Sequence, residues 1–230
     1  MTRRFPVVYG TLLAVSALGI ALALAQIFLV APEERVMGAV QKIFYIHVPL
    51  AAVTFLAVFV LLVGALGYLT TGRPVWDRLA VAACEVGWVF CTLVLITGPI
   101  WAKPAWGVWW TWEAKITTTL VLWLLLAGIV VARGYATTPE QAARVGAVLG
   151  VVAALDVPIV YKAVDWWRGQ HPIVFGPGRG DPLAPGMGRA LLLSMLAVTV
   201  LFSALVVLRM RLAALEEALA AAEDAAGRSW

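Results

Sequence analysis

Six long apolar runs follow one another along the chain, and short polar segments separate them. A helix needs about 20 apolar residues to cross a bilayer, and only helices and closed barrels satisfy their backbone hydrogen bonds in lipid. The pattern therefore predicts an all-α fold, an integral membrane bundle of six transmembrane helices in a single membrane domain over residues 1–230. The predicted spans are 7–31, 47–69, 79–100, 116–131, 145–160 and 190–208.

The two ends of the chain need separate interpretation. Arg3 and Arg4 precede the first run, and Ala23-Leu24-Ala25 resembles a signal-peptide cleavage site. However, the run continues to Val30, longer than the roughly 7–15 residues of a signal core, so we predict an uncleaved first span. Residues 209–230 carry leucines on one helical stripe and predict a cytoplasmic helical tail.

Composition supports a membrane protein. The chain is 63% hydrophobic and 13% charged, with a mean hydropathy of +0.93, whereas soluble domains are about 25% charged. A net charge of +4 spread over many loops indicates no nucleic-acid partner. Cys84 and Cys91 lie seven residues apart in one apolar run, so we expect buried packing residues rather than a disulfide or a redox pair.

Tryptophan is concentrated in one short stretch, residues 106–113, between the third and fourth runs. Its aromatic and acidic members are Trp106, Trp109, Trp110, Trp112 and Glu113. Helical spacing would place three of the tryptophans and the carboxylate on one face, and Pro104 suits a helix start. The pattern predicts a tryptophan-rich surface helix, which suits a large planar apolar ligand. The alternative, an interfacial aromatic belt, favours scattered tryptophans.

Span parity brings the two histidines of the chain to this stretch. His47 follows span one, the tryptophan stretch follows span three and His171 follows span five, so all three lie on the same membrane face. Neutral imidazole is a standard ligand of haem iron. The pattern therefore favours His47 and His171 as axial ligands of an iron porphyrin, a haem, over two ordinary interfacial polar residues.

Basic residues on the same face match the two propionates of haem. They are Lys42, Lys115, Arg168 and Arg179. Charge-assisted hydrogen bonds would hold propionates, and snorkelling to the interface is the alternative. Lys42 and Lys115 are nearest in sequence to His47 and to the tryptophan stretch.

Charge near the first span predicts the orientation. Arg3 and Arg4 predict that both termini lie in the cytoplasm, which puts the tryptophan face on the outer side. Glu85 and Asp156 lie inside predicted spans, where ionisable groups are costly. Neither has an evident partner, and we assign no role to them.

The residues of the outer face also match a known signature. Trp106-Gly107-x-Trp109-Trp110-x-Trp112-Glu113-x-Lys115 resembles the WWD motif of haem-handling membrane proteins, which include the cytochrome c maturation proteins C and F and the system II synthases (CcsA). Three further segments resemble the small six-span member, the haem exporter protein C family (CcmC). They are Lys42–Pro49, Val157–Val160 and Asp165–His171.

This resemblance implies a function. Members of the family bind haem at the outer face of the bacterial inner membrane and deliver it to the haem chaperone CcmE for c-type cytochrome biogenesis. They act beside an ABC transporter of CcmA and CcmB and the small membrane protein CcmD, as transport proteins rather than enzymes. By resemblance, His47 and His171 correspond to the axial ligands, and Gly107 and the surrounding tryptophans to the haem and chaperone platform.

Two residues depart from the family pattern. The signature usually ends in Asp followed two residues later by Arg, where this chain has Glu113 and Lys115. Lysine cannot form the bidentate fork that arginine makes to a carboxylate, so propionate binding at Lys115 is expected to be weaker or shifted.

Two other functions remain open from the residues. A small-solute transporter would need polar residues along a path and paired broken helices, and intramembrane charges are few here. A structural subunit could use the tryptophans to dock a partner protein without haem. Haem binding separates both from the first hypothesis.

Overall fold

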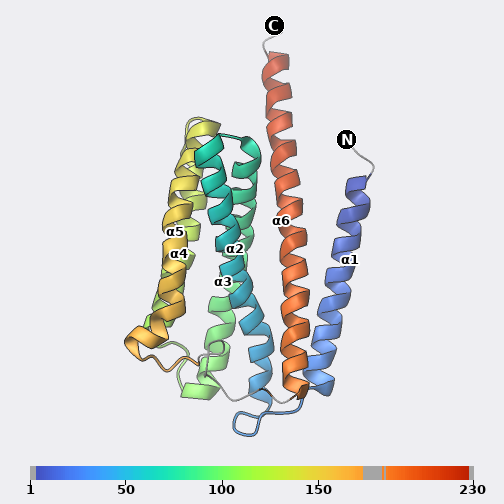
Figure 1. Cartoon of the computed structure of the whole chain (residues 1–230), viewed down its shortest axis with the longest axis vertical. Coiled ribbons are helices and arrows are strands. Elements are labelled where there is room, and N and C mark those ends of the chain that lie inside the picture. Colours follow the sequence, from blue (N-terminus) through green and yellow to red (C-terminus); the bar gives the residue numbers. More distant parts are fainter. Residues whose placement is uncertain (1–3, 173–182, 184, 228–230) are drawn as a thin grey trace.

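The chain folds into long helices joined by short loops (Figure 1). The structure, a computed structural model, describes residues 4–172, 183 and 185–227. In these ranges there is no strand, and six helices are long and apolar enough to cross a membrane. The predicted all-α bundle of six membrane helices is therefore confirmed.

The helices extend beyond the predicted apolar runs at most ends. They are α1 (Arg4–Ala25), continued by the π-helical turn η1 (Gln26–Val30), then the 3₁₀ turn η2 (Ala39–Ile43), α2 (Phe44–Thr71), α3 (Pro74–Trp106), α4 (Ala114–Gly134), α5 (Pro139–Trp167) and α6 (Pro185–Gly227). Their ends follow local chemistry. Proline stands in the first turn of α3 and α5, and Gly72, in the left-handed conformation, ends α2.

The bundle has two parts. Helices α2 to α5 pack around a core that includes Leu61, Leu122 and Leu126, and α6 packs on α2 and α3. Helix α1 packs against α6 at the edge of the bundle (Figure 1). Both chain ends lie at one end of the bundle, and the loops that carry the candidate site lie at the other.

Small residues let α2 and α3 approach closely. A Cβ added at Gly64 would lie 2.8 Å from the backbone nitrogen of Ala80 and 2.9 Å from the carbonyl oxygen of Trp76. Membrane helices associate through such small-residue contacts because lipid leaves them no hydrophobic driving force. This contact fixes the spacing of the two helices that hold His47 and the tryptophan face.

Ion pairs join the helices near the end that carries the termini. Arg133 of α4 holds both carboxylate oxygens of Asp77 at 2.7 and 2.9 Å. Arg209 of α6 donates to both oxygens of Glu85. Glu85, for which the sequence shows no partner, therefore has one 124 residues away. Asp156 is 7% exposed, and its Oδ2 has no hydrogen-bond partner among the described residues.

The cysteines are packing residues, as predicted. Cys84 and Cys91 are free and buried. Each lies against α4, with its sulfur near the carbonyl oxygen of Leu126 or of Thr119.

Helix α6 is much longer than a membrane is thick. Its 43 residues correspond to about 65 Å at 1.5 Å per residue, against about 30 Å of hydrocarbon. The tail predicted from residue 209 continues the helix of span six without a break as far as Gly227.

The tryptophan-rich stretch is not the predicted surface helix. Trp106 is the last residue of α3, Pro104 lies inside that helix, and 107–113 is irregular. Gly107 adopts a left-handed conformation (φ 78°, ψ −4°), and its N–H caps the carbonyl of Lys103. Tryptophan spacing alone misled the prediction because a glycine in this conformation ends a helix whatever the spacing after it.

Candidate functional site

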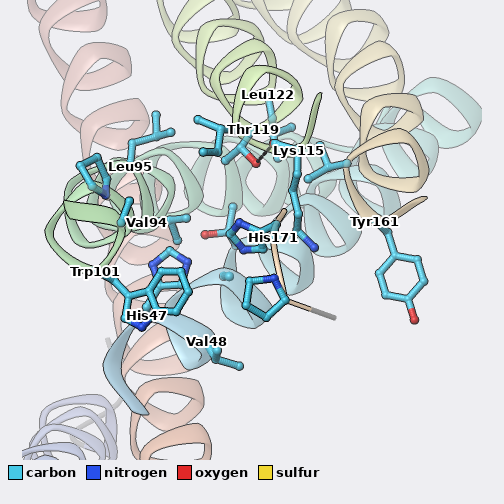
Figure 2. A pocket seen from close by; sticks show the side chains of 18 of the residues that line it. His47, Val48, Val94, Leu95, Trp101, Lys115, Thr119, Leu122, Tyr161 and His171 are labelled. Atoms are coloured by element: carbon cyan, nitrogen blue, oxygen red, sulfur yellow. Dashed lines mark hydrogen bonds between the residues drawn. The ribbon is translucent and has the colours of Figure 1, made fainter. Parts of the chain in front are cut away.

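A cavity of about 370 Å³ opens among α2, α3, α4 and α5 at the end of the bundle opposite the termini (Figure 2). Its deep part is mainly apolar and reaches Phe55 and Leu122. Its size and apolar lining are those of a small-molecule site. Of the two cations in the lining, Lys115 and Lys162, the second is paired with Asp165 at 3.3 Å. The aromatic and charged residues that line the cavity are Phe44, His47, Phe55, Trp101, Trp106, Trp109, Trp110, Lys115, Tyr161, Lys162, Asp165 and His171.

His47 enters the cavity from the first turns of α2. Its Nδ1 lies 2.8 Å from the hydroxyl oxygen of Thr97 on α3. Thr97 in turn donates its hydroxyl proton to the carbonyl of Leu93, 2.8 Å away. The imidazole is thus held from the side of α3, and its other nitrogen is left for a ligand.

His171 reaches the same cavity from the loop after α5. Arg168 ends α5 in the left-handed conformation (φ 52°, ψ 45°) and turns the chain. The ring centroid of His171 lies 6.4 Å from that of His47 and 6.2 Å from that of Trp106. The two histidines, 124 positions apart in sequence, therefore line one space (Figure 2).

Glu113 ties the loop of His171 to the start of α4. Its Oε1 lies 3.4 Å from Nδ1 of His171, and its Oε2 accepts the backbone N–H of Gln170 at 2.8 Å. A Cβ at Gly169 would lie 2.9 Å from Oε2, so glycine permits this approach. Burial raises the pKa of the Glu113 carboxyl. The neighbouring His171 and the backbone N–H groups of Gln170 and His171 together lower it by more, so the pKa lies below its usual range.

The tryptophans of the predicted platform divide between lining and surface. Trp106, Trp109 and Trp110 line the cavity, whereas Trp112 is 75% exposed and does not. Trp112 meets Trp110 edge to face, with centroids 5.6 Å apart. Trp109 is 58% exposed although it lines the cavity, so it faces both the cavity and the solvent side.

The basic residues predicted to bind propionates also differ in whether they line the cavity. Lys115 lines the cavity, with its side chain directed into it (Figure 2). Lys42 does not line it, and its ammonium donates to the carbonyl of Phe28 at 3.3 Å. Arg168 is not among the lining residues, and Arg179 lies outside the part of the chain that the structure describes.

Sequence reasoning missed two residues that hold the histidines. Thr97 is one of several threonines in apolar runs, and no pattern connects it with His47, 50 positions away. Gly169 is one glycine among 20. Only the folded chain shows what each one contacts.

The lining suits a planar ligand with anionic groups. The indole N–H groups of Trp101 and Trp110 are buried and have no hydrogen-bond partner among the residues described. Buried donors normally have acceptors. Carboxylate oxygens of a ligand would satisfy them, and the ammonium of Lys115 would balance the charge.

The histidine pair suits an iron held between two imidazoles. Two rings that bind one metal from opposite sides, each through a bond of about 2.0 Å, have centroids roughly 6 Å apart. The observed separation is 6.4 Å. Within the described residues, no group of three or more His, Cys, Asp or Glu could hold a bare metal ion, whereas a porphyrin-bound iron needs only two protein ligands.

Comparison with known proteins identifies the family. The family model described as "Heme exporter protein C" matches residues 2–224. The chain belongs to the heme exporter protein C family. Membership supports a role in haem handling for cytochrome c biogenesis, in a multi-pass protein of the bacterial inner membrane.

Three relatives illustrate the similarity. Heme exporter protein C of Bradyrhizobium diazoefficiens is 36% identical over 182 residues, which cover 79% of this chain and 69% of the relative. The Paracoccus denitrificans protein of that name is 34% identical over 187 residues, with 78% and 76% covered. The Escherichia coli K12 protein is 31% identical over 183 residues, with 79% and 73% covered.

Proposed function

We propose that this protein binds haem b in the cavity between His47 and His171 at the periplasmic face of the inner membrane and delivers it to the haem chaperone CcmE. The observation that carries this proposal is the convergence of both histidines on one tryptophan-lined cavity, with ring centroids 6.4 Å apart. In this role the two imidazoles supply the axial ligands, and the apolar walls exclude water from the porphyrin faces.

The polar groups of the cavity orient the cargo. Lys115 pairs with a propionate, and the indole N–H groups of Trp101 and Trp110 donate to carboxylate oxygens. These three are preferred to Lys42, because Lys42 is directed to the Phe28 carbonyl and does not line the cavity. Haem supplies the iron and the conjugated ring, and the protein residues bind and orient it. The proposed role is binding and delivery, and we assign no catalytic residue.

Delivery requires a surface that a partner can reach. Trp109 and Trp112 are exposed at the edge of the cavity. Large exposed aromatic side chains are typical of interaction surfaces. We assign CcmE to this surface.

The ABC transporter subunits CcmA and CcmB and the small protein CcmD act as the remaining partners. Arg3 and Arg4, with the chain ends at the opposite end of the bundle, favour cytoplasmic termini.

A transfer assay tests delivery. Haem-loaded protein in nanodiscs is mixed with purified CcmE, and movement of haem absorbance to CcmE is followed after separation. Trp112→Ala is expected to keep haem but to slow transfer at least tenfold, because truncating an aromatic anchor of an interface costs about 2 kcal/mol or more. Tyr135→Ala, which removes an aromatic side chain 84% exposed after α4 near the end of the bundle that carries the termini, is the matched control and should transfer at the wild-type rate. Equal rates for all three proteins would contradict the assigned surface.

Lysine replacement tests the propionate contact. Lys115→Met is expected to weaken haem binding about tenfold, since a hydrogen bond to a charged group contributes about 1.5–3 kcal/mol. Lys42→Met should change it little. Haem dimethyl ester, which lacks the propionate charges, should bind wild type and Lys115→Met alike. A Lys115→Met defect of the same size with both ligands would exclude the propionate contact.

A further inference from the structure

The Nδ1 atoms of the two cavity histidines face groups of different charge. His47 faces the neutral hydroxyl of Thr97 at 2.8 Å. His171 faces the carboxylate of Glu113 at 3.4 Å, with the Glu113 side chain 10% exposed. Groups behind a metal-binding imidazole set its tautomer, its orientation and its basicity.

The direction of the hydrogen bond at His47 follows from the single proton of a hydroxyl. Thr97 Oγ1 lies 2.8 Å from the carbonyl oxygen of Leu93, one helical turn earlier, and 3.3 Å from that of Val94. Both carbonyl oxygens can only accept, so the hydroxyl proton is directed to them. Thr97 Oγ1 therefore accepts from Nδ1–H of His47, and Nε2 is left with a lone pair.

The direction at His171 follows from the carboxylate. An ionised carboxylate accepts and does not donate, and Oε2 of Glu113 already accepts the N–H of Gln170. Oε1 faces Nδ1 of His171, and its negative charge favours the tautomer with the proton on this nitrogen. At 3.4 Å the pair is an electrostatic contact, and neither Oε1 of Glu113 nor Nδ1 of His171 has a hydrogen-bond partner among the described residues. The negative charge of the carboxylate still acts on the ring at this distance.

We propose that Thr97 and Glu113 are positioning residues that fix both imidazoles as Nε2 donors, and that Glu113 makes His171 the more strongly donating ligand of the pair. The tautomer assignment concerns the protein alone, whereas the unequal donation rests on the proposed haem site. A ligand that donates more electron density stabilises ferric over ferrous iron, so the carboxylate charge beside His171 is expected to lower the reduction potential of bound haem.

The first test needs no haem. Because the chain has two histidines, ¹⁵N-histidine labelling gives four ring signals, and His47→Gln assigns them. Haem-free wild type at pH 8 should show both rings as Nδ1–H tautomers. Thr97→Val should convert His47 to a tautomer mixture and leave His171 unchanged, and Thr97→Ser should restore the wild-type pattern. A His47 ring protonated at Nε2 in wild type would overturn the assignment.

The second test measures the potential of bound haem. Glu113→Gln keeps the shape but removes the charge. It should raise the midpoint potential of bound haem by about 59 mV. For a one-electron couple this corresponds to about a tenfold shift of the equilibrium from ferric towards ferrous iron. Thr97→Val should shift it far less, because no charge is lost. Glu33→Gln, at an exposed carboxylate in the loop after α1, is the control for loss of a remote charge.

The outcomes separate the inference from the function on which it rests. An unchanged potential in Glu113→Gln, or an equal shift in Glu33→Gln, would refute unequal donation while leaving haem binding intact. A wild-type protein that binds no haem would refute both the proposed function and unequal donation. The tautomer assignment does not depend on haem and would still be decided by the NMR experiment.

Discussion

Replacing both His47 and His171 with alanine is expected to abolish haem binding by this protein. The two imidazoles are the iron ligands of the proposed site, and the remaining lining would hold the porphyrin only through apolar contact and the polar groups at its edge. Wild type titrated with haem in detergent or nanodiscs should give the absorption bands of a low-spin, bis-histidine complex. The double variant should show only the spectrum of free haem.

The single variants and an added ligand sharpen this test. His47→Ala and His171→Ala should each retain haem with one axial ligand lost, as a high-spin spectrum. Millimolar imidazole should restore the low-spin bands in both, since it can enter the space left by the missing ring. Thermal unfolding of the haem-free variants checks that they fold. A folded double variant with an undiminished low-spin spectrum would exclude this histidine pair as the ligands.

A substitution outside the cavity is expected to have the second large effect. Gly64→Leu should destabilise the protein by about 3 kcal/mol or more, at the upper end of overpacking costs. A Cβ at this position already meets backbone atoms of Ala80 and Trp76 at 2.8–2.9 Å, and backbone cannot rotate away as a side chain does. Helices α2 and α3 must separate, which moves His47 away from Thr97, so haem binding should weaken as well.

Gly128 offers a matched control for Gly64. It lies in a membrane helix, α4, and a Cβ added there has nothing within 4 Å. Gly128→Leu should therefore unfold at nearly the wild-type temperature and bind haem normally. If Gly64→Leu and Gly128→Leu behave alike in thermal denaturation, the close approach of α2 and α3 does not contribute to stability.

The predicted and observed sites differ in an instructive way around residues 106–113. Parity of the spans was sufficient to put His47, His171 and the tryptophans at one end of the molecule, because a chain that crosses a membrane must change sides. Side-chain spacing was not sufficient to describe the tryptophan stretch, because Gly107 ends α3 at Trp106. As a result, Glu113 lies beside His171 rather than on a helix face with the tryptophans.

Sequence patterns were also insufficient to identify the partners of the charged residues. From sequence, Lys42 and Lys115 were equally good candidates for an anionic ligand, and only their directions in the fold separate them. Glu85 had no evident partner until α6 brought Arg209 beside it.

Apolar patterning and motif spacing were enough to predict the helical membrane fold, the common membrane face of the two histidines and the tryptophans, and the family signature. Apolar run length and span parity are properties of the chain in any membrane, so they can be read without coordinates. The tertiary structure alone decided which groups touch: Thr97 behind His47, Glu113 behind His171, and Lys115 rather than Lys42 in the cavity. These contacts join residues about 50 or more positions apart, and they depend on helix rotation and loop direction, which hydrophobic patterning leaves undetermined.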